Sequence, residues 1–434
     1  AIGDTWSNDI RDMLNASPFL PNKDENGDYH YAIPWEGREA NPIGKMDYVN
    51  GNNLSKSHTL QGNIFATIQP ISGLKIRSSF GYTFSANNYR RFVPAYRLAS
   101  NVFEDSNTVS QEMSMGGNLM WENTLTYDFK IKQNSINVLV GQSIEKHGLG
   151  DSMNGSNINS IFDDFKHAYL NNTTLITNRT TLGGSPWEEN KLASFFGRVN
   201  YDYANKYMAT VVMRMDGSSN FARGHRWGYF PSVSAGWVIS EESFMAPSKK
   251  WLDFLKIRAS WGQNGNQNID PFQYLATIRF KDADYSFGPD KSILSSGSYP
   301  DILPNEEVTW ETSEQIDLGF DAYLFNNRLG INFDYYIKNT KDWLVEAPVL
   351  DIYGTQAPFI NGGDVQNKGF EFSFNWNDNI GDFQYGATIN IAHNKNEVTR
   401  IANSERIIHG DPDILSNLTT EVYRQKFAYQ IGYF

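Results

Sequence analysis

The stretch DGSSNFARGHRWGYF, residues 216–230, gathers charged and aromatic side chains that could contact a ligand. Arg223, His225 and Arg226 could together bind an anionic or other polar substrate at the mouth of a site. The same residue types also occur in a plain polar loop, where they cap strand ends and face water. The sequence favours the loop, because small residues alternate with apolar ones directly after it, and the three side chains are kept as candidate substrate contacts.

No other set of residues has the spacing of a catalytic centre. The chain has seven histidines, and they form neither an H-E-x-x-H motif nor another paired metal-binding pattern. A G-x-S-x-G nucleophile elbow and a P-loop are also missing from the sequence. We therefore expect no enzymatic activity and no catalytic cofactor.

One short stretch resembles the beginning of a calcium-binding loop. NKDENGD, residues 22–28, spaces Asn22, Asp24, Asn26 and Asp28 as the first ligands of such a loop are spaced. Its twelfth position is Ile33, where a bidentate glutamate would be required. We expect a polar turn, with bound calcium as the alternative.

Composition narrows the classes of protein further. The chain has 434 residues, a net charge of −12 spread along its length, and no cysteine. Binding to nucleic acid is disfavoured because phosphate contacts need a basic surface. Aromatic residues make up 14% of the chain, yet no apolar segment is long enough for a membrane-spanning helix.

Hydrophobic and polar residues alternate with a period of two, which predicts β-strands with one apolar and one polar face. In 331–338, for example, Phe333 and Tyr335 oppose Asp334. In 58–69, Phe65 is the one residue that breaks the alternation, because it is apolar on the polar face. Twelve strands are predicted, at 58–69, 74–84, 113–129, 136–144, 195–203, 207–214, 232–240, 255–261, 315–322, 331–338, 370–376 and 383–391. The polar faces carry Lys75, Arg77, Arg198, Arg214, Asp317, Asp321, Asp334 and Glu371.

Short and long connections between these strands alternate without exchanging ends. Short ones fall near 70–73, 130–134, 204–206, 324–327 and 379–382, with a longer one at 241–253; polar loops cover 85–112, 146–190, 217–228, 264–306 and 341–365. An antiparallel transmembrane β-barrel of the outer membrane has this asymmetry, with periplasmic turns and extracellular loops. Its apolar faces meet lipid, and its polar faces line a wet lumen where charges need no buried partner. A secreted all-β protein, such as a propeller or tandem sandwiches, is the alternative.

Aromatic residues in the long loops are further candidates for binding. Tyr285, Phe287, Trp343 and Tyr353 could stack on sugar rings or peptide side chains. They could equally pack the loops together or form part of an interfacial girdle.

Four blocks of the sequence resemble one known family. They are DGSSNFARGHRWGYFPSVSAGWVISEESFM, LKIRASWGQNGNQNI, WETSEQIDLGFDAYLFNNRLGINFDYYIKNTKDWL and NKGFEFSFNWND. In order and spacing they resemble the SusC/RagA family of TonB-dependent outer-membrane transporters of Bacteroidetes. The resemblance is dense over 191–397 and looser over 41–145.

The resemblance implies a plugged barrel of twenty-two strands that imports an oligomeric nutrient, glycan or peptide. It also implies energy from the TonB complex and a SusD-like surface lipoprotein as a lid. No counterpart of the plug or of the final strands is recognisable, so we expect the middle of a longer protein: an extracellular loop region at 1–57, barrel strands and loops at 58–397, and a loop with the start of another strand at 398–434. A complete twelve-stranded pore and a surface adhesin or glycan-binding protein without a lumen are the alternatives.

Overall fold

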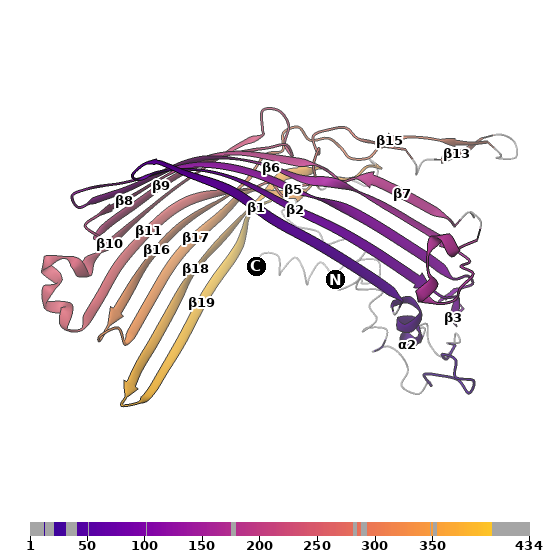
Figure 1. Ribbon diagram of the computed structural model, residues 1–434, viewed down its shortest axis with the longest axis horizontal. Coiled ribbons are helices and arrows are strands. Elements are labelled where there is room, and N and C mark those ends of the chain that lie inside the picture. Colours follow the sequence, from indigo (N-terminus) through magenta and orange to yellow (C-terminus); the bar gives the residue numbers. More distant parts are fainter. Residues whose placement is uncertain are drawn as a thin grey trace. The chain divides into compact units, whose positions relative to one another are not determined.

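Twelve long strands form one continuous path in a thirteen-stranded sheet (Figure 1). The computed structural model describes residues 13, 21–31, 41–50, 52–100, 102–174, 179–280, 284–287, 293–347, 349 and 354–401. The path is formed by β1 (Asn53–Ile71), β2 (Leu74–Val93), β5 (Thr108–Ile131), β6 (Asn134–Ile158), β8 (Asn190–Tyr203), β9 (Tyr207–Ser218), β10 (Trp227–Val238), β11 (Leu252–Asn266), β16 (Glu311–Leu324), β17 (Leu329–Glu346), β18 (Phe359–Ile380) and β19 (Phe383–Ile401). Eleven of these strands contain their whole predicted segment, and β10 contains residues 232–238 of the segment predicted at 232–240, because Ile239 and Ser240 begin η4. The predicted all-β class and strand count are confirmed.

Shorter elements lie before β1 and in the connections between the long strands. They are α2 (Pro42–Lys45), η1 (Met46–Asn50), β3 (Tyr96–Ala99), β4 (Val102–Glu104), η2 (Phe165–His167), η3 (Leu170–Asn172), β7 (Thr181–Pro186), η4 (Ile239–Glu241), η5 (Ser243–Lys250), β12 (Ile278–Arg279), β13 (Asp284–Phe287), β14 (Ile293–Ser296) and β15 (Tyr299–Pro300). β7 pairs with β6 and is the thirteenth strand of the sheet. None of the helices in the described ranges is long and apolar enough to span a bilayer.

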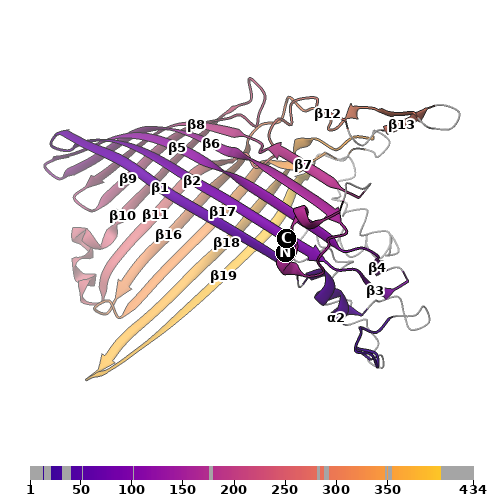
Figure 2. The ribbon, with the colours of Figure 1, turned by 45° about the vertical axis from the view of Figure 1, so that its right-hand side comes forward.

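The predicted alternation of connections is also confirmed. Hairpins β8–β9, β16–β17 and β18–β19 close with tight turns (Figure 2). Ala204 and Asn205 have φ angles of 55° and 56° in the first of them, left-handed values that let the chain reverse within the three residues 204–206, where the Lys206 N–H donates to the Tyr203 carbonyl at 2.9 Å. We call the end of the strands that carries these turns the short-turn end, and the opposite end the long-loop end.

Several strands extend further toward the long-loop end than the sequence predicted. β6 continues to Ile158 although a loop was expected from residue 146, and β2 continues to Val93 although a loop was expected from residue 85. The strand region covers Asn53–Ile401 instead of 58–397, and residues 402–434 lie outside the described part. These extensions lack a strict alternation of apolar and polar residues. Some of their side chains, such as Phe92 and Ile158, are instead buried against loop segments, so the contrast between a lipid-facing and a water-facing side is lost there.

Clustering of contacts divides the chain into two compact units. Unit 1 comprises Ala1–Asn63, Gly81–Leu119 and His147–Glu189, and unit 2 comprises Ile64–Phe80, Met120–Lys146 and Asn190–Phe434. Unit 1 has two small buried clusters, one around Leu98 and Ala99 and one around Phe92 and Val109. Unit 2 contains β8 to β19 and the residues considered below, apart from the turn at 22–28, which lies in unit 1.

The apolar face of unit 2 is exposed rather than buried. Val211, Leu318 and Ile389 expose 54%, 52% and 53% of their surface, which a water-facing sheet would not favour. A single row of cross-strand partners on this face is apolar or aromatic throughout: Tyr203, Tyr207, Trp237, Ile257, Phe320, Phe333, Phe372 and Ile391. We call this face the apolar belt.

The register fixes the tilt of these strands. On β8 the member of this row is Tyr203, which lies directly at the short turn of β8–β9. On β19 the member of the same row is Ile391, eight residues away from Phe383 at the short turn of β18–β19. Eight residues span about 26 Å along a strand, and the seven inter-strand steps from β8 to β19 span about 34 Å. If both turns lie at one level, the strands are inclined by about 38° to the membrane normal, within the range of transmembrane barrels.

The same geometry gives the height of the belt. On β19 the outward-facing side chains are apolar from Phe383 to Ile391, and on β8 they are apolar from Phe195 to Tyr203. Eight residues tilted by about 38° rise about 21 Å, close to the apolar band of roughly 25 Å in outer-membrane barrels.

Aromatic side chains with polar partners mark both edges of the belt. At the short-turn end Glu242 accepts hydrogen bonds from Tyr207 Oη at 2.5 Å and Trp237 Nε1 at 3.1 Å. At the long-loop end Trp261 Nε1 donates to Glu314 Oε1 at 2.9 Å. Rings with an apolar body and a polar tip are typical of the boundary between hydrocarbon and headgroups.

Candidate functional site

The polar face of unit 2 carries an ion-pair network that spans three strands. Arg258 on β11 donates through Nε to Asp321 Oδ2 on β16 at 2.8 Å, and its Nη1 lies 2.9 Å from Asp334 Oδ1 on β17. Asn332 Nδ2 donates to Asp321 Oδ1 at 2.7 Å. The sequence predicted Asp321 and Asp334 on this face, where charges need no buried partner; the structure joins them through Arg258, which was not among the predicted site residues.

A glycine makes this network possible. Gly319 lies on β16 as the cross-strand partner of both Arg258 and Asp334. A Cβ at Gly319 would lie 2.1 Å from Asp334 Oδ1, so any side chain there would displace the carboxylate. The missing side chain lets Asp334 lean across β16 to reach Arg258.

Further carboxylates surround the same arginine. A hollow of about 440 Å³ is lined by Arg258, Gln315, Asp317, Asp334, Tyr336 and Glu371. Glu371 is the cross-strand partner of Asp334, and two carboxylates at opposed positions repel each other. Asp317 and Glu371, both predicted on the polar face, therefore make this part of the wall acidic.

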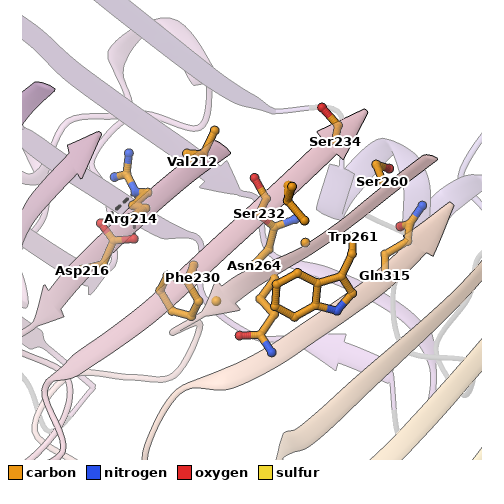
Figure 3. A pocket seen from close by; sticks show the side chains of 14 residues that line it. Val212, Arg214, Asp216, Phe230, Ser232, Ser234, Ser260, Trp261, Asn264 and Gln315 are labelled. Atoms are coloured by element: carbon orange, nitrogen blue, oxygen red, sulfur yellow. Dashed lines mark hydrogen bonds and ion pairs between the residues drawn. The ribbon is translucent and has the colours of Figure 1, made fainter. Parts of the chain in front are cut away.

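A second hollow, of about 640 Å³, lies nearer the long-loop end (Figure 3). Hydroxyl and amide side chains line it, including Ser232, Ser260, Asn264 and Gln315. The predicted Arg214 is also in its wall, but this guanidinium is already engaged: Nε donates to both Asp216 carboxylate oxygens at 2.9 and 2.8 Å, and Nη2 donates to the buried Ser194 Oγ at 3.0 Å. The hollow is therefore rich in hydrogen-bonding groups and carries little net charge.

The remaining predicted charges of the polar face lie on β2 and β8. Lys75 and Arg198 are exposed. The guanidinium carbon of Arg77 lies 3.8 Å from the ring centroid of Phe65. This cation–π contact explains why Phe65 breaks the alternation of its segment, since the aromatic ring serves the polar face.

The loop at 219–226 is tied down by a buried apolar cluster. Phe221 and Phe230 pack with Trp310, whose ring centroid lies 5.4 Å from each of theirs, and Ile269, Val308 and Leu344 complete the cluster. The cluster joins the loop to the segments before β16 and at the end of β17. Periodicity gave no signal for it, because Phe230 and Leu344 are the only members on strands and the other four come from irregular segments.

The predicted contacts in this loop divide into two kinds. Arg226 donates through Nε to the Phe221 carbonyl at 3.1 Å, and its own carbonyl accepts from Trp310 Nε1 at 2.8 Å. His225 Nε2 lies 3.7 Å from Glu307. The contacts of Arg226 hold the loop in place, and whether either residue meets a substrate stays a prediction. Arg223 is exposed and, within the described residues, has no side-chain partner.

Of the predicted loop aromatics, Trp343 is the one whose side chain lies in the described part of the chain. The Trp343 ring packs over Gly363, at an irregularity of the β17–β18 ladder, so this residue belongs to a strand. Tyr285 and Phe287 lie on β13, which pairs with β14, and their side chains are outside the described part, as is all of Tyr353.

The stretch at 22–28 forms a turn stabilised by one carboxylate. Asp24 Oδ1 accepts from the backbone N–H groups of Asn26 and Asp28 at 2.9 and 3.0 Å. Ile33 lies outside the described residues, and within them no group of three or more His, Cys, Asp or Glu side chains could hold a metal ion. Calcium in this loop stays a prediction.

Comparisons with known proteins agree with this architecture. The family model "TonB dependent receptor-like, beta-barrel" matches residues 3–430. The chain belongs to this family of TonB-dependent receptor β-barrels. Such receptors are barrels of the bacterial outer membrane, so the apolar belt of this receptor chain faces lipid and its polar face lines the lumen. The family comprises transporters and receptors and not enzymes, in line with the sequence.

Individual relatives support the SusC/RagA resemblance. The receptor chain is 31% identical over 378 residues to TonB-dependent receptor P3 of Formosa agariphila, covering 85% of the chain and 36% of the relative. It is 29% identical over 406 residues to the TonB-dependent receptor SusC of Bacteroides thetaiotaomicron, covering 91% and 38%. The RagAB peptide transporter structure matches with a TM-score of 0.74 at 22% identity, covering 88% and 41%. The chain thus spans little more than a third of the length of these curated relatives.

Proposed function

We propose that the protein containing this chain imports an oligomeric nutrient, a glycan or a peptide, across the outer membrane. The observation that carries this proposal is the two-sided sheet: a lipid-facing belt on one face, and on the other a luminal wall with two polar hollows. An adhesin would need a binding surface at one end of the strands, but it would not need hollows along the wall.

Energy and capture would come from partners. Similarity to SusC and to the RagAB transporter supports the TonB complex as the source of energy and a SusD-like surface lipoprotein as the lid. The second hollow, of about 640 Å³, offers hydroxyl and amide groups that can form hydrogen bonds with the hydroxyls of a sugar or with the backbone of a peptide. Its lining therefore supports a polar oligomer without choosing between the two classes.

Uptake by the full-length protein tests the proposal. Cells carrying it would be given labelled oligosaccharides or oligopeptides, with and without an uncoupler of the inner-membrane proton gradient. Energy-dependent accumulation of either class is expected. Binding at the cell surface without accumulation would refute import and favour the adhesin.

Two neighbouring substitutions connect the result to the hollow. Ser260 lines the hollow, whereas Ala259 next to it belongs to the lipid-facing set. Ser260→Trp should obstruct the wall and lower uptake strongly. Ala259→Trp should leave uptake unchanged, because an aromatic ring is accepted in the belt. Equal uptake by both variants would show that this hollow is not on the substrate path.

A further inference from the structure

Two lysines face each other on the lipid side of the sheet. Lys368 on β18 is the cross-strand partner of Lys395 on β19. Both belong to the outward-facing set, since the next outward pair toward the short-turn end is Phe370 and His393, followed by Phe372 and Ile391. Like charges at directly opposed positions destabilise a sheet unless something lies between them to neutralise them.

The neighbouring side chains neutralise only one of the two. Lys395 Nζ lies 3.1 Å from Glu397 Oε2. Lys341, the next outward lysine on β17, is paired with Glu314 at 2.6 Å. His393 packs its ring 5.8 Å from that of Phe370. Among the described residues Lys368 has no acidic partner, although it is half-buried.

The depth of the pair follows from the strand tilt. Phe370 is the last apolar outward residue of β18 and Ile391 that of β19, counted from the short-turn end. We take the level of Ile391 as the long-loop edge of the belt. With a tilt of about 38° and about 3.3 Å per residue, the Cα atoms of Lys368 and Lys395 lie roughly 7 and 10 Å beyond that level, measured along the membrane normal. Lysine side chains near the edge of a membrane reach along the surface to the headgroups, so both ammonium groups can meet in the headgroup layer.

We propose that Lys368 and Lys395 bind the phosphate of an anionic lipid headgroup. Two lysines at directly opposed positions on adjacent strands can both donate to one phosphate, and that anion would remove the repulsion between them. The acyl chains of the same lipid would lie on Phe370, Phe372 and Ile391 directly below. This apolar floor is why we assign the site to a lipid and not to free phosphate.

Native mass spectrometry of the full-length protein in detergent tests the site. Dissociation constants would be measured for phosphatidylglycerol and for zwitterionic phosphatidylcholine, with inorganic phosphate as a competitor. The site variant is Lys368→Gln with Lys395→Gln. The matched control is Lys338→Gln, because Lys338 lies one residue from the outward Ile337 but on the luminal face.

The expected result is a loss confined to the anionic lipid. Removing a lysine near a membrane surface costs roughly fivefold in binding, so the double variant should weaken phosphatidylglycerol binding by well over fivefold. Phosphatidylcholine binding and the Lys338→Gln control should be unchanged. Unchanged phosphatidylglycerol binding in the double variant would overturn the proposal. Displacement of the lipid by inorganic phosphate at equal concentration would also overturn it, by showing an anion site without lipid selectivity.

Discussion

An arginine placed at successive depths of one strand should reveal the tilt of the barrel wall. Ile331 and Ile337 on β17 both face lipid, six residues apart. The cross-strand row that contains Phe333 begins on β8 at the short-turn edge of the belt and reaches the long-loop edge on β19. On β17, between these two strands, Ile331 lies two residues nearer the short-turn end than Phe333, which places it near the midplane. Ile337 then lies about 16 Å nearer the long-loop end, beyond the hydrocarbon.

The cost of each substitution follows from this depth. Ile331→Arg should lower the free energy of unfolding by about 2–4 kcal/mol, the value for an arginine at the midplane of a barrel, and Ile337→Arg by about 0–1 kcal/mol. Ser373→Arg is the control, because Ser373 pairs with Asn332 beside Ile331 but faces the wet lumen, where a charge is hydrated. Its effect should be small.

Denaturant titration of the full-length protein folded into lipid vesicles would measure all three. Equal costs for Ile331→Arg and Ile337→Arg would refute the tilt derived from the register. A larger cost for Ser373→Arg than for Ile331→Arg would mean that the two faces are exchanged, as a one-residue error in register would produce.

Three other outcomes are expected. Gly319→Ala should destabilise the protein by about 1–3 kcal/mol by displacing the carboxylate beside it, whereas Gly330→Ala, whose Cβ would have its nearest neighbour at 3.3 Å, should cost less in the same unfolding titration. Phe221→Ala should remove about 3–5 kcal/mol from the cluster at the long-loop end, measured as faster proteolysis in the connection before β16. The hydrogen bond from Tyr207 lowers the pKa of Glu242. This contact therefore stabilises the fold above the ordinary carboxyl pKa, and the stabilisation is lost as the pH falls through the lowered value. Tyr207→Phe should raise the pKa of Glu242, as measured by a carbon-13 NMR titration.

Sequence periodicity was sufficient to predict the sheet and its two faces. A strand with lipid on one side and water on the other must alternate, so each residue from Ile331 to Lys338 could be assigned to a face before its neighbours were known. The alternation of turns and loops was equally visible, because tight turns require particular residues and short spacing. The strand extensions to Val93 and Ile158 were missed, because residues such as Phe92 and Ile158 pack against loop segments there and the alternation between lipid and water no longer applies.

Register decided what the strands do together. The sequence supplied Arg258, Asp321, Asp334 and Gly319 as separate polar or small residues on the correct face, but their contacts depend on how far each strand slides along the next. The register also places Lys368 opposite Lys395. Phe65 breaks the alternation of its strand, and only the structure shows that its ring contacts the Arg77 guanidinium. Periodicity within a strand records only which side of the sheet a residue faces; the offset between strands is fixed by hydrogen bonding and turn geometry across the whole sheet, so the luminal network and the tilt of the belt emerge only in the tertiary structure.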